Sequence, residues 1–166
     1  MSVTSILIRD LIQSISLYRL DISINSYSNE IEDLNIILER LSADTDPKQV
    51  IEEAHKKGIL VFCGVVNIEQ ALKVEALGCD AVIAVNNEAG GHRGDRSPKQ
   101  ITKEINEALK IPVISAGGVG DKSELEEKMS YGAVGVSIGS PFIASEEAGV
   151  SKEYKEACVA YGAKDI

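Results

Sequence analysis

Residues 111–124 read IPVISAGGVGDKSE and contain the repeating unit from which the fold can be worked out. The run Ile111–Ser115 is apolar without polar alternation, which is typical of a parallel strand covered on both faces. Three glycines follow closely, and Asp121 with Glu124 three residues later has the pattern of a helix N-cap. The stretch therefore predicts a strand, a tight turn and a helix in direct succession.

The same succession recurs on both sides of this stretch. Further strands are predicted at three apolar runs: Ile59–Val66, Asp80–Val85 and Ala133–Ile138. Helix starts are predicted at Asp46-Pro47, Asn67, Ser97-Pro98 and Ser151, and helix ends at Gly58, Gly78 and Gly132. Strands and helices in alternation predict an α/β fold of parallel (β/α) repeats, with 1–166 as a single domain.

The first 45 residues follow a different pattern, because no glycine occurs before Gly58 and the strand–helix alternation is missing. Here we expect a helix over Ser5–Leu20, a short strand over Leu20–Ile24 and a second helix over Asn29–Leu41. We therefore separate an atypical N-terminal segment, 1–45, from the regular part, 46–166.

Charge and hydropathy exclude two classes of function. The chain has 166 residues and a formal charge of −9, from 17 Lys and Arg against 26 Asp and Glu. No basic cluster is present, so we expect no nucleic-acid binding. The longest apolar run, 59–66, is shorter than the ~20 residues that a membrane helix needs, so we expect no membrane span.

The cysteines and histidines indicate the compartment and argue against a metal. Cys63, Cys79 and Cys158 are scattered without a CxxC pair, and no secretory leader opens the sequence, so we expect reduced thiols in a cytoplasmic protein. The two histidines, His55 and His92, stand at unrelated positions, so we expect no metal site.

Residues 86–94, NNEAGGHRG, are the densest candidate site. Three glycines let a ligand approach the backbone closely, and His92 among them can exchange a proton near neutral pH. A glycine-rich surface turn that holds a histidine by chance is the alternative. Glu88 and Arg93 are candidate catalytic residues, although a local ion pair that fixes the loop is the simpler interpretation.

Two more glycine-bearing turns follow predicted strands. Residues 115–121, SAGGVGD, direct backbone N–H groups and a helix start to one point, which suits a phosphate; a plain turn capped by Asp121 is the alternative. In residues 136–142, VSIGSPF, Gly139 and Ser140 offer further donors. In (β/α)8 barrels, phosphates commonly lie between the loops after the last two strands, so we expect these two turns to adjoin.

The blocks described above resemble those of the nitronate monooxygenases, formerly called 2-nitropropane dioxygenases. The resemblance is carried by GCDAV at 78–82 leading into EAGGHRG at 88–94, by IPVISAGG at 111–118 and by GSPFIASEEA at 139–148. It covers 46–166. The resemblance implies an FMN-binding (β/α)8 barrel, of which this chain matches the C-terminal half, so we expect a half to partial TIM barrel.

The resemblance also implies roles for individual residues. His92 matches the catalytic base that acts on the carbon next to a nitro group. FMN contacts are implied for Gly90, Gly91, Gly117, Gly118, Ser137, Ile138, Gly139 and Ser140. Ser137 and Val85 stand where many members have glutamine, so two side-chain amides that could bond FMN are missing.

The implied function is an FMN-dependent oxidoreductase that oxidises nitroalkanes or nitronates with O2. One alternative is a truncated, non-catalytic remnant that binds flavin or phosphate. Another is a flavin-type enoyl-[acyl carrier protein] reductase, a related group with similar blocks. A half barrel leaves two sheet edges open, so we expect a homo-oligomer or a partner chain that covers them.

Overall fold

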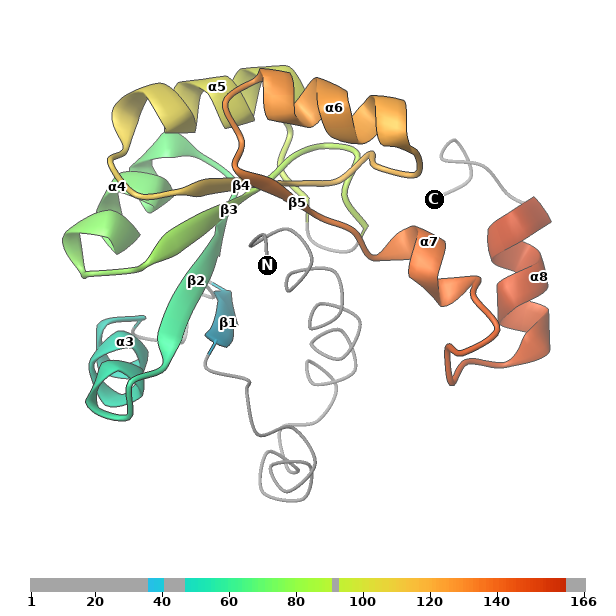
Figure 1. The fold of residues 1–166 in the computed structure, drawn as a ribbon, viewed down its shortest axis with the longest axis horizontal. Coiled ribbons are helices and arrows are strands. Elements are labelled where there is room, and N and C mark those ends of the chain that lie inside the picture. Colours follow the sequence, from blue (N-terminus) through green and yellow to red (C-terminus); the bar gives the residue numbers. More distant parts are fainter. Residues whose placement is uncertain (1–35, 41–46, 91–92, 161–166) are drawn as a thin grey trace.

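The computed structural model describes residues 36–40, 47–90 and 93–160, which form a five-stranded parallel sheet with the strand order β1-β2-β3-β4-β5 (Figure 1). The strands are β1 (Ile36–Arg40), β2 (Leu60–Val65), β3 (Ala81–Val85), β4 (Val113–Ala116) and β5 (Gly135–Ser137). The helices are α3 (Pro47–Lys56), α4 (Ile68–Ala76), α5 (Pro98–Ala108), α6 (Lys122–Ser130), α7 (Ser140–Ile143) and α8 (Lys152–Ala160).

Strand and helix alternate along the whole described chain, which confirms the predicted α/β fold of parallel (β/α) repeats. Each strand pairs in parallel with the strand that follows it in sequence, and a helix lies in each connection. Each of the four apolar runs predicted as strands overlaps one strand, and β4 extends one residue past its predicted run, to Ala116. The reason is that Val and Ile fit a pleated surface that is covered on both faces.

The predicted helix starts rest on local hydrogen bonds that the structure reproduces. The Asn67 side chain accepts from the Gln70 N–H at 2.8 Å. Full capping boxes open α5 and α6, at Ser97 with Gln100 and at Asp121 with Glu124. In each case the cap side chain accepts from a backbone N–H group that has no partner inside the helix.

Gly58, Gly78 and Gly132 follow α3, α4 and α6 with φ between +72° and +98°, as expected of glycines that end helices. Ser151 precedes α8, and its hydroxyl accepts from the Tyr154 N–H at 3.3 Å. Asp46, predicted as the first cap, lies outside the described residues.

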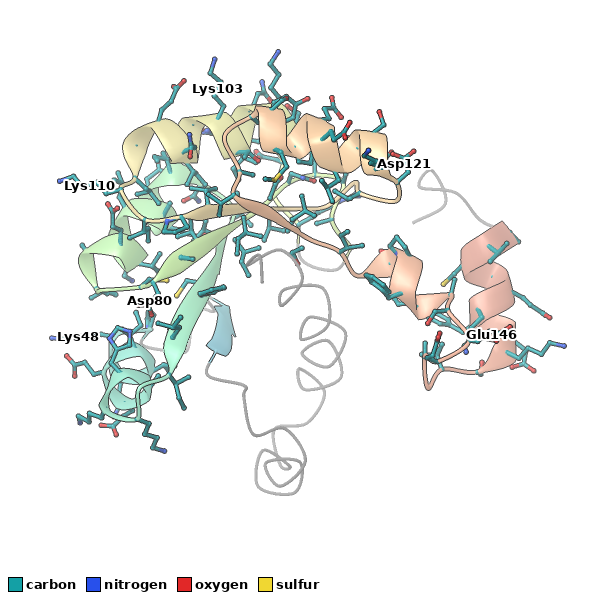
Figure 2. The ribbon with its side chains drawn as sticks, in the orientation of Figure 1. Lys48, Asp80, Lys103, Lys110, Asp121 and Glu146 are labelled. Carbon is teal, nitrogen blue, oxygen red and sulfur yellow. The ribbon has the colours of Figure 1, made fainter. Side chains whose placement is uncertain are left out.

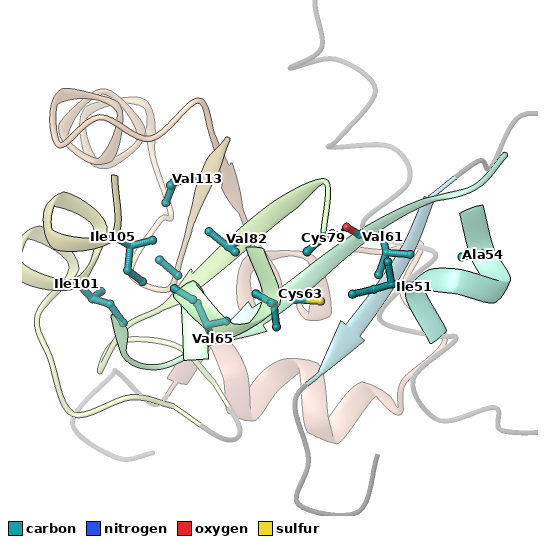
Figure 3. Close-up of a cluster of buried hydrophobic side chains, with 13 residues drawn as sticks. Ile51, Ala54, Val61, Cys63, Val65, Cys79, Val82, Ile101, Ile105 and Val113 are labelled. Atoms are coloured by element: carbon teal, nitrogen blue, oxygen red, sulfur yellow. Dashed lines mark hydrogen bonds between the residues drawn. The ribbon is translucent and has the colours of Figure 1, made fainter. Parts of the chain in front are cut away.

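The main core lies between the sheet and helices α3, α4 and α5 (Figure 3). Alternate residues of β2 point into it, and each is fully buried: Val61, Cys63 and Val65. Helix α5 contributes Ile101 and Ile105, which are four residues apart and therefore share one helix face. Because each side chain is enclosed by others in the cluster, removing one leaves a cavity rather than a new surface.

A second, smaller apolar cluster is formed by those side chains of β2, β3 and β4 that do not point into the main core. Ile83 of β3 and Ile114 and Ala116 of β4 are buried in it, with Phe62 and Val85 packed against them. Successive side chains of a strand point to opposite faces, so these residues lie on the sheet face away from the main core. Burial on both faces explains why the strand sequences lack polar alternation.

The structure corrects two expectations about the N-terminal part. The helix expected over Asn29–Leu41 is wrong at 36–40, which form β1 in register with β2, with Ile36 opposite Leu60. The sheet of the described residues therefore has five strands: the four predicted at the apolar runs, and β1, which was not predicted. Residues 36–38, IIL, are good strand formers, and pairing with β2 satisfies their backbone hydrogen bonds. The helix and strand expected over 5–24 lie outside the described residues.

Helices α7 and α8 lie beyond the β5 side of the sheet (Figure 1). No residue of either helix is buried, and Tyr154 and Val159 of α8 are 53% and 77% exposed. None of the helices in the described part of the chain is long and apolar enough to cross a membrane. Over the same described ranges, no group of three or more His, Cys, Asp or Glu residues could hold a metal ion.

We predict that Ile105→Ala lowers the free energy of unfolding by about 2–5 kcal/mol, because it leaves a cavity in the main core. Leu72→Ala on α4 is the control: Leu72 is 47% exposed, and its truncation should cost well under half as much. Urea unfolding followed by circular dichroism measures both variants. Equal losses would contradict the assignment of the core to this face of the sheet.

Candidate functional site

Three loops meet at one edge of the sheet because β3, β4 and β5 are parallel neighbours. Val85, at the end of β3, lies opposite Ala116, and Ala116 lies opposite Ser137 at the end of β5. The segments that follow, 86–90, 117–120 and 138–140, therefore begin side by side at the carboxyl edge. This is the edge at which parallel α/β proteins bind their ligands.

The first and second loops are in direct contact. Gly117 and Gly118 have φ values of +107° and +65°, a region that L side chains rarely adopt. A Cβ atom on Gly117 would overlap Asn86 and Ala89, and one on Gly118 would overlap the Glu88 carboxylate. The backbone conformation therefore favours glycine at both positions. At Gly117 the closeness of the Ala89 backbone also excludes a side chain, and at Gly118 a side chain would displace the Glu88 carboxylate.

Asn86 joins these two loops through its side chain. It is fully buried; its Oδ1 accepts from the Glu88 N–H at 2.8 Å, and its Nδ2 donates to the Gly117 carbonyl at 3.1 Å. Its backbone N–H also donates to the Ala116 carbonyl at 3.1 Å. The amide thus satisfies one donor and one acceptor that the two turns leave without partners.

The Glu88 carboxylate lies against Gly118 and pairs with a lysine from another element. Its Oε2 is 3.4 Å from Nζ of Lys128 on α6. The ion pair expected between Glu88 and Arg93 is therefore wrong, since Arg93 donates to the Asn87 carbonyl at 3.3 Å instead. Lys128 could not be found from the sequence, because it is 40 residues from Glu88 and its helix is placed only by the sheet.

The third loop approaches the first at Gly90. A Cβ atom built on Gly90 would lie 3.6 Å from Oγ of Ser140, the first residue of α7. Ser137, Ile138 and Gly139 are half-buried at the end of β5. Of the residues predicted to contact a cofactor, all that the structure describes therefore gather at this edge.

His92 and Gly91 lie outside the described residues, between Gly90 and Arg93. The role of His92 therefore stays a prediction from the sequence. The described neighbours on both sides, Gly90 and Arg93, belong to the carboxyl-edge loop that follows β3.

Several backbone donors at this edge have no acceptor within the described part of the chain. The N–H groups of Gly118 and Val119 in the second loop and of Gly139 in the third are such donors. Gly118 and Gly139 are half-buried and Val119 is buried. Half-buried donors at neighbouring strand ends suit an anionic group such as a phosphate.

The other histidine, His55, lies at the opposite, amino edge of the sheet. Its Nε2 forms a 2.8 Å hydrogen bond with Oδ2 of Asp80, and the same oxygen accepts from the Val61 N–H at 2.8 Å. Asp80 directly precedes β3, and Figure 2 shows it beside α3, far from Asp121 at the start of α6. His55 thus connects the C-terminal end of α3 to Asp80 and does not contact the carboxyl-edge loops.

None of the three cysteines forms a disulfide, and Cys63 and Cys79 are buried. A hydrogen bond between the side chains of Cys63 and Cys79 lowers the pKa of the Cys79 thiol, against the opposing effect of burial. Cys79 Sγ also donates to the Ala81 carbonyl at 2.8 Å. These contacts are local to the core and do not reach the three loops.

A surface depression of about 430 Å³ lies along α5 and beside the C-terminal end of α6. Lys103, Asn106 and Tyr131 are among its lining residues. None of its lining residues belongs to the three loops. The geometry therefore favours the loops, and not the depression, as the candidate site.

Comparisons with known proteins bear on the family and the fold of the chain. The sequence profile of the nitronate monooxygenase family matches residues 29–166. A nitronate monooxygenase of Paraburkholderia phytofirmans is 32% identical over 124 residues, which cover 69% of this chain and 34% of the relative. The chain thus spans about a third of the length of that curated relative.

Solved structures show the same likeness. FabK from Thermotoga maritima superposes with a TM-score of 0.70 and 28% identity over 89% of this chain and 51% of its own. A nitroalkane oxidase from Streptomyces ansochromogenes gives a TM-score of 0.65 and 29% identity over 74% of this chain and 38% of its own. The fold is accordingly a partial TIM barrel, as predicted.

We predict that Gly118→Ala destabilises the chain more than Gly58→Ala does. The two glycines have similar φ values, +65° and +72°, but a Cβ on Gly58 meets nothing within 4 Å, whereas one on Gly118 overlaps Glu88. Gly58→Ala should cost about 1–2 kcal/mol from the backbone alone. Gly118→Ala should cost about 1–3 kcal/mol more in urea unfolding; equal costs would contradict the packing of Glu88 on the turn.

We predict that Asn86→Ala costs about 2–3 kcal/mol, because it leaves the Glu88 N–H and the Gly117 carbonyl without their partner. Asn87→Ala is the matched control, since Asn87 is exposed and bonds through its backbone. Hydrogen exchange of the Glu88 amide, read by NMR, should accelerate in the Asn86 variant alone. Unchanged exchange there would show that Asn86 does not hold the two loops together.

Proposed function

The chain belongs to the nitronate monooxygenase family, and we propose that it forms the phosphate-binding and proton-accepting part of an FMN-dependent oxidoreductase. The single observation that supports this best is the convergence of the three glycine-bearing loops at the carboxyl edge of β3, β4 and β5. The substrates we propose are nitroalkanes or nitronates, with O2 as the second substrate.

The backbone N–H groups of Gly118 and Gly139 would bind the FMN phosphate. They follow adjacent strands, are half-buried and have no acceptor within the described residues. The remaining phosphate and flavin contacts that we propose come from Gly90, Gly91, Gly117, Ser137, Ile138 and Ser140. Backbone donors suit a chain of net charge −9, which has no basic cluster to attract a phosphate.

The residues present fit a phosphate in spite of the carboxylate beside it. Glu88 lies against Gly118 and would repel a phosphate if it stood alone. The ammonium of Lys128, 3.4 Å from the carboxylate, offsets that charge. Ser137 and Val85, which replace glutamines found in many members, leave the backbone donors unaffected.

We propose His92 as the general base. A neutral imidazole would accept the proton from the carbon next to a nitro group, with the negative charge passing to the nitro oxygens. The bound flavin would supply the electron transfer to O2, which no side chain of the protein can supply. His92 follows Gly90 by two residues, so the same loop that approaches the phosphate turns would carry the base.

The chain covers only about a third of that curated relative, so activity, substrate and partners belong to the proposal. A second copy of the chain or a partner chain would cover the open sheet edges. Cytoplasmic location remains part of the same proposal.

We predict that the purified chain binds FMN, with quenching of flavin fluorescence on titration, and that it oxidises a nitroalkane. His92→Ala should retain FMN and lose ~100-fold or more of its turnover with neutral nitroalkanes, because they must lose a proton. The same variant should retain most of its turnover with preformed nitronates, which have already lost it.

His55→Ala is the control, since His55 lies at the amino edge and should leave both activities unchanged. A chain that binds no FMN would contradict the proposed cofactor. Equal turnover by His92→Ala and the unchanged chain would contradict the proposed base. Oxidation of NADH or NADPH with an enoyl thioester, in place of nitroalkane oxidation, would favour the enoyl reductase alternative.

A further inference from the structure

Helix α6 presents a single buried residue, and that residue is charged. Lys128 is 3% exposed, whereas the other residues of α6 are half-buried or exposed. An ammonium group taken out of water is costly unless a partner of opposite charge lies close to it. The place of Lys128 in the fold therefore depends on the groups that its Nζ contacts.

Two carboxylates contact this ammonium. Glu127, the preceding residue on α6, has Oε2 at 3.7 Å from Nζ, and Glu88 has Oε2 at 3.4 Å. Glu127 belongs to the same helix as Lys128, so this contact does not connect α6 to another element. Glu88 belongs to the loop after β3, and α6 follows β4, so the second contact joins two separate (β/α) units.

Glu88 is held at both of its ends. Its backbone N–H donates to Asn86 Oδ1 at 2.8 Å, and its carboxylate occupies the space that a side chain on Gly118 would need. A negative charge therefore lies close to the Cα atom of Gly118, whose N–H group has no acceptor in the described residues. Without Lys128, that charge would oppose the binding of any anion at this turn.

We propose that Lys128 is a positioning and charge-balancing residue: it holds Glu88 over Gly118 and neutralises it, so that the turn accepts a phosphate. The phosphate part of this proposal rests on the proposed function. The positioning part concerns the protein alone, and it predicts that the segment Glu88–Gly90 loses its order when the ammonium is removed.

Amide hydrogen exchange of the chain without cofactor tests the positioning part. Lys128→Met keeps the length of the side chain and removes its charge; the Glu88 and Ala89 amides should then exchange ~10-fold faster or more, while amides of β2 and β3 remain protected. Lys122→Met is the matched control, since Lys122 lies on the same helix with its side chain 87% exposed. Unchanged exchange at Glu88 and Ala89 would overturn the positioning role.

A double-mutant cycle on FMN affinity tests the charge balance. Lys128→Met should weaken FMN binding ~10-fold or more, because it leaves Glu88 uncompensated next to the phosphate. Adding Glu88→Gln to that variant should recover most of the affinity, since both charges are then absent. If the residues only fill space, the double variant binds no better than Lys128→Met, and the charge-balancing role is overturned.

The experiment also covers two other cases: Lys128→Met does not fold, or the unchanged chain does not bind FMN. If Lys128→Met does not fold, Glu88→Gln and the neutral pair Glu88→Gln with Lys128→Met take its place. Faster exchange at the Ala89 amide in Glu88→Gln then supports the positioning role, and unchanged exchange overturns it. If the unchanged chain binds no FMN, the proposed function and the charge-balancing role fail together, while the exchange measurement still decides the positioning role.

Discussion

The contact between the Asn86–Gly90 segment and the Gly117-Gly118 turn is the constraint on which the candidate site depends. The buried Asn86 amide bonds both loops at once, and two glycines without side chains allow the backbones to approach. Because parallel strands end at a common edge, β3, β4 and β5 bring the two turns and the third loop together without any long connection. The site thus follows from sheet geometry, while its internal spacing follows from Asn86 and the glycines.

Charge at this edge is arranged locally rather than across the whole molecule. A chain of net charge −9 repels anions at long range, so a phosphate would have to be bound by backbone donors at short range. The buried Lys128 and the Glu88 carboxylate form an ion pair beside these donors, and Glu127 of the same helix also lies 3.7 Å from the ammonium. The same pair links α6 to the loop after β3, so electrostatics and loop position are coupled in a single contact.

The family likeness and the fold agree over the described strands, and the chain spans about a third of the curated relative compared here. Within that third lie the three loops at the carboxyl edge, which are the part of a (β/α) barrel that varies with function. The core between the sheet and α3, α4 and α5 is separate from them. Mutations in that core should therefore report on folding and leave the loop contacts in place.

The sequence by itself determined the α/β alternation, four of the five strands, the helix caps at Asn67, Ser97 and Asp121, and the three glycine-bearing loops. These features depend on contacts between near neighbours in the chain, which short patterns record. Only the tertiary structure decided that 36–40 form a strand rather than a helix, because the strand depends on a ladder with β2, which lies more than 20 residues further along the chain. It also decided that Glu88 pairs with Lys128 and not with Arg93, since partners 40 residues apart meet only after β4 and α6 have packed.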